Sequence, residues 1–245
     1  MLSPELKDEK PVQPEKNDEV VATYDRLEQV ALREGLGAEQ DAYYVAIGDQ
    51  FEQEWYGSRE ADKKYADDLQ AMTEAVDAFA RGDLVELGAG SGHWTVRCVN
   101  AGARVTVVEP SETMRSVTRR RLTSAGKTAR LMLGRSEAIP LGDHKMDRCL
   151  MAFVLSHLDA ATRDATFKEI ARVLRPGGEL LLMDNLRGPD APVALVVRRV
   201  VNAQPFRVLK VQLRPEEVAA MIDPFARVQE SKTLNHTWIL RARVV

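Results

Sequence analysis

An apolar segment that runs directly into three alternate glycines is the feature that most restricts the fold of this chain. Residues 84–87 read LVEL, and Gly88, Gly90 and Gly92 follow before a helix-like stretch. Glycine adopts the positive φ angles of a tight turn and lets a ligand approach the backbone closely. The helix N-terminus that follows adds free N–H groups. A strand, a glycine turn and a helix in this order are typical of α/β proteins that bind nucleotide-like ligands.

Two common uses of such a turn do not fit its spacing. The dinucleotide pattern G-x-G-x-x-G requires a further glycine where the chain has His93 or Thr95. The Walker A pattern also fails, because no Gly-Lys-Ser/Thr follows. Glu109 ends the next apolar run, and a carboxylate in that place can accept hydrogen bonds from ribose hydroxyls. The alternative is a strand-end carboxylate without a ligand.

Strand-like and helix-like segments alternate along the middle of the chain. The apolar runs cover 83–88, 103–110, 129–134, 146–153 and 179–184, and helical patterns cover 91–99, 111–124 and 160–174. Such alternation predicts a parallel sheet with right-handed crossovers.

The flanking segments follow other patterns. Apolar spacing predicts helices over 20–31, 38–51, 58–79, 192–201 and 214–222, an extended run at 206–213, and a terminal antiparallel hairpin from 226–233 and 237–245. Ser58 is the expected N-cap of the third of these helices. We therefore expect a disordered tail over 1–18, an N-terminal helical lid over 19–82, and an α/β domain over 83–245 with a cover insertion around 187–214.

Composition narrows the function. The 245 residues carry a net charge of −3, which argues against a general nucleic-acid binder. Cys98 and Cys149 lie far apart with no ligand spacing, so we expect no metal site. Neither a signal core nor an apolar stretch of about 20 residues occurs. We expect a cytoplasmic protein without a membrane partner, and we leave a homodimer open.

Four segments in order resemble the class I S-adenosylmethionine-dependent methyltransferases. They lie between Asp83 and Asp184 and read VELGAGSG, TVVEPSETM, GRSEAIP with MDRCLMAFVLSHL, and ARVLRPGGELLLMD. In that family a terminal hairpin completes a seven-stranded sheet whose last strand is antiparallel. The resemblance therefore implies a doubly wound, mostly parallel α/β sheet and S-adenosyl-L-methionine as the cofactor.

The resemblance also assigns residues to parts of the cofactor. The methionine part would lie against Glu86, Gly88, Ala89, Gly90 and Gly92, the ribose against Glu109, the adenine against Pro110, Met114, Ser136 and Glu137, and the sulfonium against Met151, Ala152 and Phe153.

Arg135 is a departure from the family pattern. Many members have an aspartate at this position, directly after the glycine of the third motif, and it bonds the adenine amino group. An arginine cannot accept a hydrogen bond. Either Glu137 or a backbone carbonyl substitutes, or the adenine is held more weakly.

The catalytic and substrate residues follow from less specific signals. His157, in FVLSHLD after the fourth strand, is a candidate general base, and the alternative is a helix-start histidine bonded to backbone. Trp55, Tyr56 and Arg59 are candidate lid or substrate residues, and the alternative is packing of the lid onto the core. The insertion is rich in cations, which favours either an anionic substrate or a solvated helix face; these cations are Arg187, Arg198, Arg199, Arg207, Lys210 and Arg214.

We therefore predict methyl transfer to an oxygen, nitrogen or carbon atom of a small-molecule acceptor, and we leave open whether the acceptor is anionic and belongs to specialised metabolism. One alternative is a protein on the same fold that binds S-adenosylmethionine without methylating. A nucleic-acid or protein methyltransferase would require a recognition domain or a broad basic face, and a nicotinamide enzyme would require the missing glycine.

Overall fold

The structure is a computed structural model that describes residues 19–24, 36–51 and 62–245. The predicted tail over 1–18 and the predicted lid residues Trp55, Tyr56 and Arg59 lie outside the described residues, as does Ser58.

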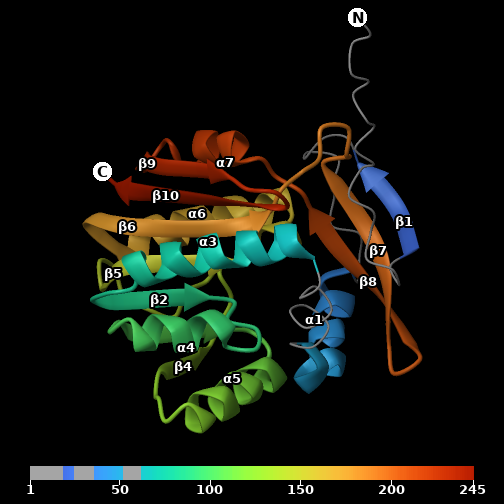
Figure 1. The fold of residues 1–245 in the computed structure, drawn as a ribbon, viewed down its shortest axis with the longest axis horizontal. Helices are drawn as coiled ribbons and strands as arrows, with labels where there is room; N and C mark the ends of the chain where they lie inside the picture. Colours follow the sequence, from blue (N-terminus) through green and yellow to red (C-terminus); the bar gives the residue numbers. More distant parts are fainter. Residues whose placement is uncertain (1–18, 25–35, 52–61) are drawn as a thin grey trace, which may run out of the picture.

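A seven-stranded sheet forms the centre of the protein, as predicted (Figure 1). Its strand order is β4-β3-β2-β5-β6-β10-β9, and β2 through β6 pair in parallel. The terminal hairpin adds β10 antiparallel to β6. The strands are β2 (Asp83–Leu87), β3 (Arg104–Glu109), β4 (Arg130–Leu133), β5 (Met146–Ala152), β6 (Leu174–Asn185), β9 (Ala226–Thr233) and β10 (Thr237–Val244).

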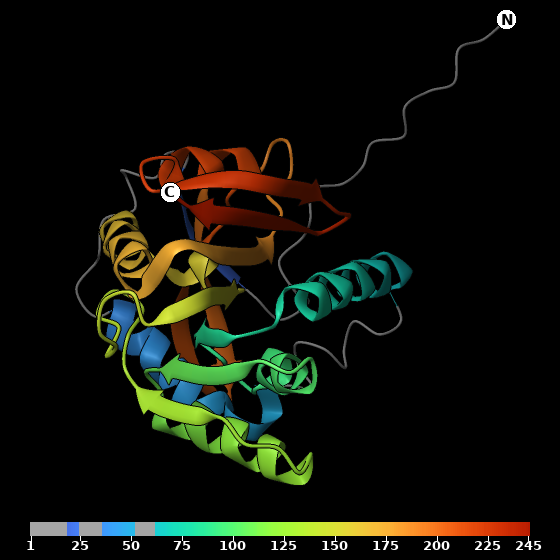
Figure 2. The same cartoon turned by 90° about the vertical axis from the view of Figure 1, so that its left-hand side faces the viewer.

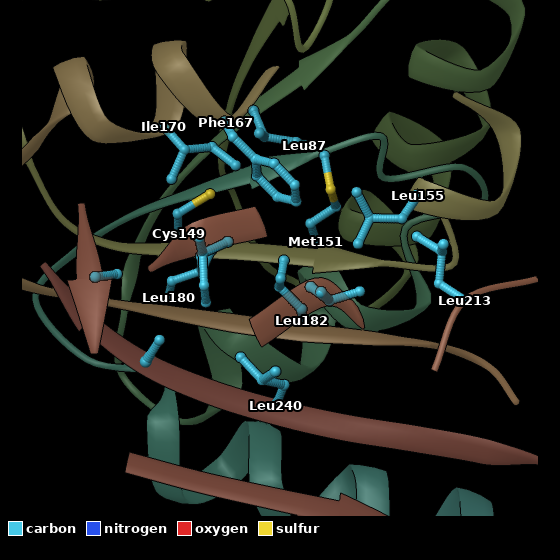
Figure 3. Packing of buried hydrophobic residues seen from close by; sticks show 14 of the residues in the cluster. Leu87, Cys149, Met151, Leu155, Phe167, Ile170, Leu180, Leu182, Leu213 and Leu240 are labelled. Atoms are coloured by element: carbon cyan, nitrogen blue, oxygen red, sulfur yellow. The ribbon is translucent and has the colours of Figure 1, made fainter. Parts of the chain in front are cut away.

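Helices cover both faces of this sheet. Figure 2 shows α3 (Lys63–Phe79) and α4 (His93–Asn100) on one side and α6 (Ala160–Val173) on the other. Because side chains alternate along a strand, neighbours on β2 face opposite layers. Leu84 packs with α3 and α4, whereas Val85 and Leu87 pack with α6 and α7 (Pro215–Ile222). Figure 3 shows the second layer around Phe167 and Ile170.

Local capping sets where the helices begin. Ser111 precedes α5 (Glu112–Ser124), and its side chain accepts a hydrogen bond from the Met114 N–H at 3.2 Å. Asp159 caps α6 in the same way through the Thr162 N–H at 2.8 Å. The N-cap of α3 is Asp62, so the prediction of Ser58 as this cap was wrong. A carboxylate so placed satisfies N–H groups that the helix leaves open.

A second, three-stranded antiparallel sheet corrects two helix predictions. The predicted helix over 20–31 overlaps the strand β1 (Glu19–Tyr24), and the one over 192–201 contains β7 (Ala194–Val201). The extended run predicted at 206–213 is confirmed as β8 (Gln204–Val211).

The turn between β7 and β8 explains the second correction. Asn202 and Ala203 have φ angles of 51° and 65°. Two consecutive positive φ angles are the signature of a tight hairpin turn. Because of this turn, β7 pairs with β8 as a strand and does not form a helix. The apolar run of β7 has no local signal that distinguishes strand from helix.

The helix predicted over 38–51 is confirmed as α1 (Leu36–Ile47), followed by the short 3-10 helix η2 (Gly48–Gln50). Tyr43 and Ile47 of α1 pack on Phe206 and Val208 of β8. Among the described helices, none is long and apolar enough to cross a membrane.

Candidate functional site

A pocket opens at the carboxyl ends of β2, β3 and β5. The space within it amounts to about 940 Å³, counted out to open solvent. The sites of doubly wound sheets lie at this edge. The lining residues are Gln40, Asp41, Tyr44, Phe51, Gly88, Ala89, Gly90, Ser91, Trp94, Val108, Glu109, Pro110, Met114, Arg135, Ser136, Glu137, Ala152, Phe153, Val154, His157 and Leu158.

The glycine turn forms one wall with bare backbone. Gly88, Gly90 and Gly92 have φ angles of 70°, 54° and 77°. A Cβ on Gly88 would lie 2.6 Å from Cγ2 of Val154, so a side chain there would collide with the pocket wall. Gly92 is the N-cap of α4, and it does not itself line the pocket.

Glu109 ties the end of β3 to the glycine turn. Its Oε2 accepts a hydrogen bond from the Gly90 N–H at 3.2 Å, and Oε1 accepts one from the Ser111 N–H at 3.0 Å. Burial raises the pKa of Glu109 to about 7, against the opposing effect of these backbone N–H groups. Each carboxylate oxygen keeps a second lone pair for a ligand. Glu109 therefore presents acceptors to the pocket from a fixed position.

Glu86 is a second buried carboxylate beside the pocket rather than on its lining. Its Oε2 accepts a hydrogen bond from the Thr95 Oγ at 2.6 Å. Burial, followed by the nearby Glu109, raises the pKa of Glu86 to about 7 despite this bond. Met151 is likewise buried behind the lining. The cofactor contacts predicted for Glu86, Gly92 and Met151 stay predictions.

Three buried polar atoms of lining residues lack a hydrogen-bond partner among the described residues. They are the Ser91 Oγ, the Trp94 Nε1 and the His157 Nδ1. A buried polar atom without a partner is costly, and such atoms usually mark a bound ligand or water. Bare backbone, a carboxylate and open polar atoms together fit a cofactor that carries a ribose and an amino-acid tail.

Helix α1 forms one wall of the pocket and contributes Gln40, Asp41 and Tyr44 to the lining. These three residues were not predicted from the sequence. Gln40 Nε2 donates to the His157 carbonyl at 3.1 Å, and its Oε1 accepts from the Leu209 N–H at 3.2 Å. These partners lie 117 and 169 residues away in the chain. No local pattern reveals contacts of that range.

The loop after β4 brings the predicted adenine residues Ser136 and Glu137 to the lining. Ser136 Oγ lies 2.9 Å from Thr166 Oγ1 of α6, which fixes the loop. Arg135 lines the pocket as well, and its guanidinium donates to Oδ2 of Asp41. The residue that departs from the family pattern is therefore paired with a carboxylate from α1.

The loop after β5 carries His157, in the short 3-10 helix η4 (Leu155–His157). Its Nε2 lies 3.0 Å from the Tyr44 hydroxyl and 3.2 Å from Lys210 Nζ. Burial, followed by Lys210 and Arg199, lowers the pKa of His157 well below its ordinary value. The imidazole is therefore neutral at neutral pH. Because Lys210 can only donate, Nε2 is an acceptor in this arrangement.

The end of β5 also places Ala152 and Phe153 on the lining, as predicted from the sequence. Phe153 has a φ angle of 59°, which is rare for an aromatic residue. Its N–H donates to the Met183 carbonyl at 2.8 Å, which holds this conformation. Positive φ angles at residues other than glycine concentrate at functional sites.

Three of the six cations of the predicted cover make ion pairs with other described residues. Arg187 pairs with Glu217 at 2.5 Å, Arg198 with Glu19 at 3.0 Å, and Arg207 with Glu39 at 2.5 Å. Arg199 is buried and donates to the Tyr43 hydroxyl at 3.0 Å. Lys210 contacts the pocket lining, because its Nζ lies 3.2 Å from Nε2 of His157.

The central segment of the chain is similar to known proteins. Residues 84–178 match a family described as "Methyltransferase domain". An uncharacterized methyltransferase of Mycobacterium tuberculosis is 41% identical over 118 residues, which cover 46% of this chain and 45% of that protein. The chain thus spans less than half the length of this relative.

Solved structures share the fold over most of the chain. A Burkholderia thailandensis 1,6-didemethyltoxoflavin-N1-methyltransferase with bound 1,6-didemethyltoxoflavin and S-adenosylhomocysteine matches 96% of this chain and 99% of that one, with a TM-score of 0.70 and 18% identity. The DhpI complex with SAH matches 86% of this chain and 98% of that one, with a TM-score of 0.71 and 21% identity. At these identities the likeness concerns the fold.

Proposed function

We propose that this protein transfers a methyl group from S-adenosylmethionine to an oxygen, nitrogen or carbon atom of a small acceptor. The match of residues 84–178 to a methyltransferase domain and the fold shared with solved methyltransferases support this proposal. The observation that carries the proposal is the arrangement at the ends of β2 and β3. There the bare turn at Gly88 and Gly90 lies directly beside the Glu109 carboxylate.

The cofactor would be held by three groups of residues. Glu109 accepts hydrogen bonds from the ribose hydroxyls, while the turn from Gly88 to Ser91 binds the amino-acid tail. Pro110 and Met114 flank the adenine, next to Ser136 and Glu137. The open Ser91 Oγ and Trp94 Nε1 gain partners when the pocket fills. When bound, S-adenosylmethionine supplies a methyl group activated by its positive sulfonium.

The acceptor would lie at the end of the pocket formed by the loop after β5. In the sheet order, β5 and β4 lie on opposite sides of β2, so His157 and Arg135 mark opposite ends. Ala152 and Phe153 form the wall between the turn and His157. Alignment of acceptor, methyl and sulfur in a closed pocket supplies much of the catalysis in such displacements. The aromatic rings of Tyr44 and Phe51, which also line the pocket, exclude water from it.

In this proposal His157 positions the Tyr44 hydroxyl, and it takes a proton from the acceptor only where the acceptor has one to lose. A neutral imidazole whose pKa is well below the ordinary value is a weak base at neutral pH. Its contacts with the Tyr44 hydroxyl and Lys210 suit it better to hold the Tyr44 hydroxyl toward the pocket.

An anionic acceptor is also part of the proposal. Lys210 and Arg199 both lower the pKa of His157, so positive charge lies behind this end of the pocket. A carboxylate or an ionised hydroxyl would be favoured there.

A labelled-cofactor screen tests the function. The protein is incubated with S-adenosylmethionine carrying a deuterated methyl group and with a panel of small acids, phenols and amines, and mass spectrometry detects products shifted by one labelled methyl. We expect at least one acidic acceptor to be methylated, with a KM that rises with salt concentration. Cofactor binding without turnover of any acceptor would instead support a protein that binds without methylating.

A further inference from the structure

The adenine end of the pocket lacks an acceptor at the expected position. Gly134 is followed by Arg135, whose guanidinium can only donate. The structure places the carboxylate of Asp41 against this guanidinium, and both residues line the pocket. Asp41 belongs to α1, 94 residues earlier in the chain. A carboxylate therefore lies beside position 135, although it is supplied by a different part of the protein.

The neighbours of Asp41 fix its place. Glu39 accepts hydrogen bonds from the Arg207 N–H at 3.0 Å and from Arg207 Nε at 2.9 Å, both on β8. Gln40 bonds the His157 carbonyl and the Leu209 N–H. The Tyr43 hydroxyl accepts a hydrogen bond from the buried Arg199. Three residues that flank Asp41 thus anchor α1 to the second sheet and to the loop after β5.

Arg135 orients this carboxylate without saturating it. The guanidinium occupies Oδ2, whereas Oδ1 has no hydrogen-bond partner among the described residues. A carboxylate offers about four acceptor sites in all. Asp41 also lies close enough to Glu109 to raise its pKa, so the two carboxylates share one end of the pocket. The ion pair is about half exposed, so the Asp41 carboxylate is accessible.

Building on the proposed function, we propose that Asp41 accepts a hydrogen bond from the adenine amino group of the cofactor and that Arg135 positions Asp41 for this role. The exchange of an acceptor for a cation in the loop after β4 is thereby compensated by a carboxylate on α1. Cofactor binding then depends on α1, which also contributes Tyr44 to the acceptor end.

Glu137 is the rival acceptor and provides the matched control. It lines the same pocket two residues beyond Arg135. Its Oε2 lies 3.3 Å from the Ser136 Oγ, so it already takes part in a hydrogen bond within its own loop. Asp41→Asn and Glu137→Gln both replace a carboxylate by an amide of the same size.

Calorimetric titration with two ligands tests the proposal without requiring turnover. The ligands are S-adenosylhomocysteine and S-inosylhomocysteine, in which a carbonyl oxygen replaces the adenine amino group. A carboxylate can accept from the amino group but not from the oxygen, whereas an amide can pair with either. We expect the wild-type protein and Glu137→Gln to bind the adenosyl ligand about tenfold more tightly, since charge-assisted bonds are strong. In Asp41→Asn the preference should fall below about threefold.

The ratio of the affinities for the two ligands distinguishes a failure of the Asp41 assignment from a failure of the proposed function. The altered ring nitrogen of inosine is common to the titrations of all three proteins. An Asp41→Asn protein with the wild-type preference would overturn the assignment, as would loss of the preference in Glu137→Gln. A wild-type protein that binds neither ligand would instead refute the proposed function.

Discussion

The Glu109 carboxylate accepts a hydrogen bond from the Gly90 N–H at 3.2 Å and so joins the ends of two adjacent parallel strands. This contact places an acceptor pair beside bare backbone, which is the arrangement that a ribose next to an amino-acid tail requires. We expect Glu109→Ala to weaken S-adenosylhomocysteine binding by about tenfold or more, because two charge-assisted hydrogen bonds are lost. Calorimetric titration measures this change.

The control for Glu109 is Glu230→Gln, on the exposed strand β9 far along the sheet order. It removes a carboxylate charge without touching the pocket, so affinity should stay within about twofold of the wild-type value. Equal losses in both variants would mean that general electrostatics, and not a ribose contact, explains the role of Glu109.

Glu86 makes stability depend on pH in a defined direction. Its pKa is about 7 in the folded protein against an ordinary value of 4.5, so between these values the folded state binds more protons than the unfolded state. Stability then falls as pH rises through this window, and the penalty is complete above it. Its size is on the order of 3 kcal/mol for a shift of this magnitude. Glu86→Gln removes the charge and keeps an acceptor for Thr95.

Urea unfolding of Glu86→Gln and the wild-type protein should therefore show the variant to be more stable at pH 8, with a difference that shrinks toward pH 5. Glu230→Gln provides the exposed comparison and should show no such trend. A Glu86→Gln variant that is equally or less stable at pH 8 would show that the charge of the buried Glu86 carboxylate does not destabilise the folded protein.

The steric reason for a glycine at position 88 can be tested separately from the backbone strain that a side chain would cause there. Gly88 and Gly126 have similar φ angles of 70° and 64°, but a Cβ on Gly126 meets nothing within 4 Å, whereas one on Gly88 meets Val154 at 2.6 Å. Gly126→Ala should cost about 1 kcal/mol through strain alone. Gly88→Ala should cost clearly more, and Val154→Ala in the same chain should recover part of the excess.

Thermal unfolding of these four proteins, including Val154→Ala alone, completes the cycle. For a chain of this size 1 kcal/mol corresponds to roughly 2–4 °C in Tm. Equal Tm losses for Gly88→Ala and Gly126→Ala, or no coupling with Val154→Ala, would exclude the predicted collision.

The pKa of His157 depends on the positive charge of Lys210. Burial and the nearby ammonium hold the His157 pKa well below its ordinary value of 6.5, so the ring should still be neutral at pH 6.5. Lys210→Met removes the charge and should move the midpoint upward toward 6.5. NMR titration of the imidazole resonances, assigned by loss of one signal in His157→Gln, follows this midpoint. A His157 ring that titrates near 6.5 in the wild-type protein would contradict the arrangement.

The central sheet was predictable because its signals are local. Each of the strands β2, β3 and β5 is an apolar run that ends in a turn or a helix start, and Ser111 and Asp159 mark two of those helices. The glycine turn and Glu109 could likewise be placed from spacing alone. Most of the cofactor residues that the family resemblance implied do line the pocket.

What the sequence did not reveal depends on contacts between distant segments. The strand β7 alternates between buried and exposed residues only over its last half, and its pairing with β1 joins residues 170 or more positions apart. Asp41 and Tyr44 lie on a helix with little amphipathic character, so nothing in their neighbourhood predicts that they face a pocket. Their partners Arg135 and His157 lie far along the chain.

Calorimetric titration of the wild-type protein with S-adenosylhomocysteine and, in parallel, with NAD tests the central claim most directly. The bare turn beside Glu109, without the third glycine of a dinucleotide site, predicts one-to-one binding of S-adenosylhomocysteine and no measurable heat with NAD. Tight binding of NAD, or no binding of S-adenosylhomocysteine, would contradict it.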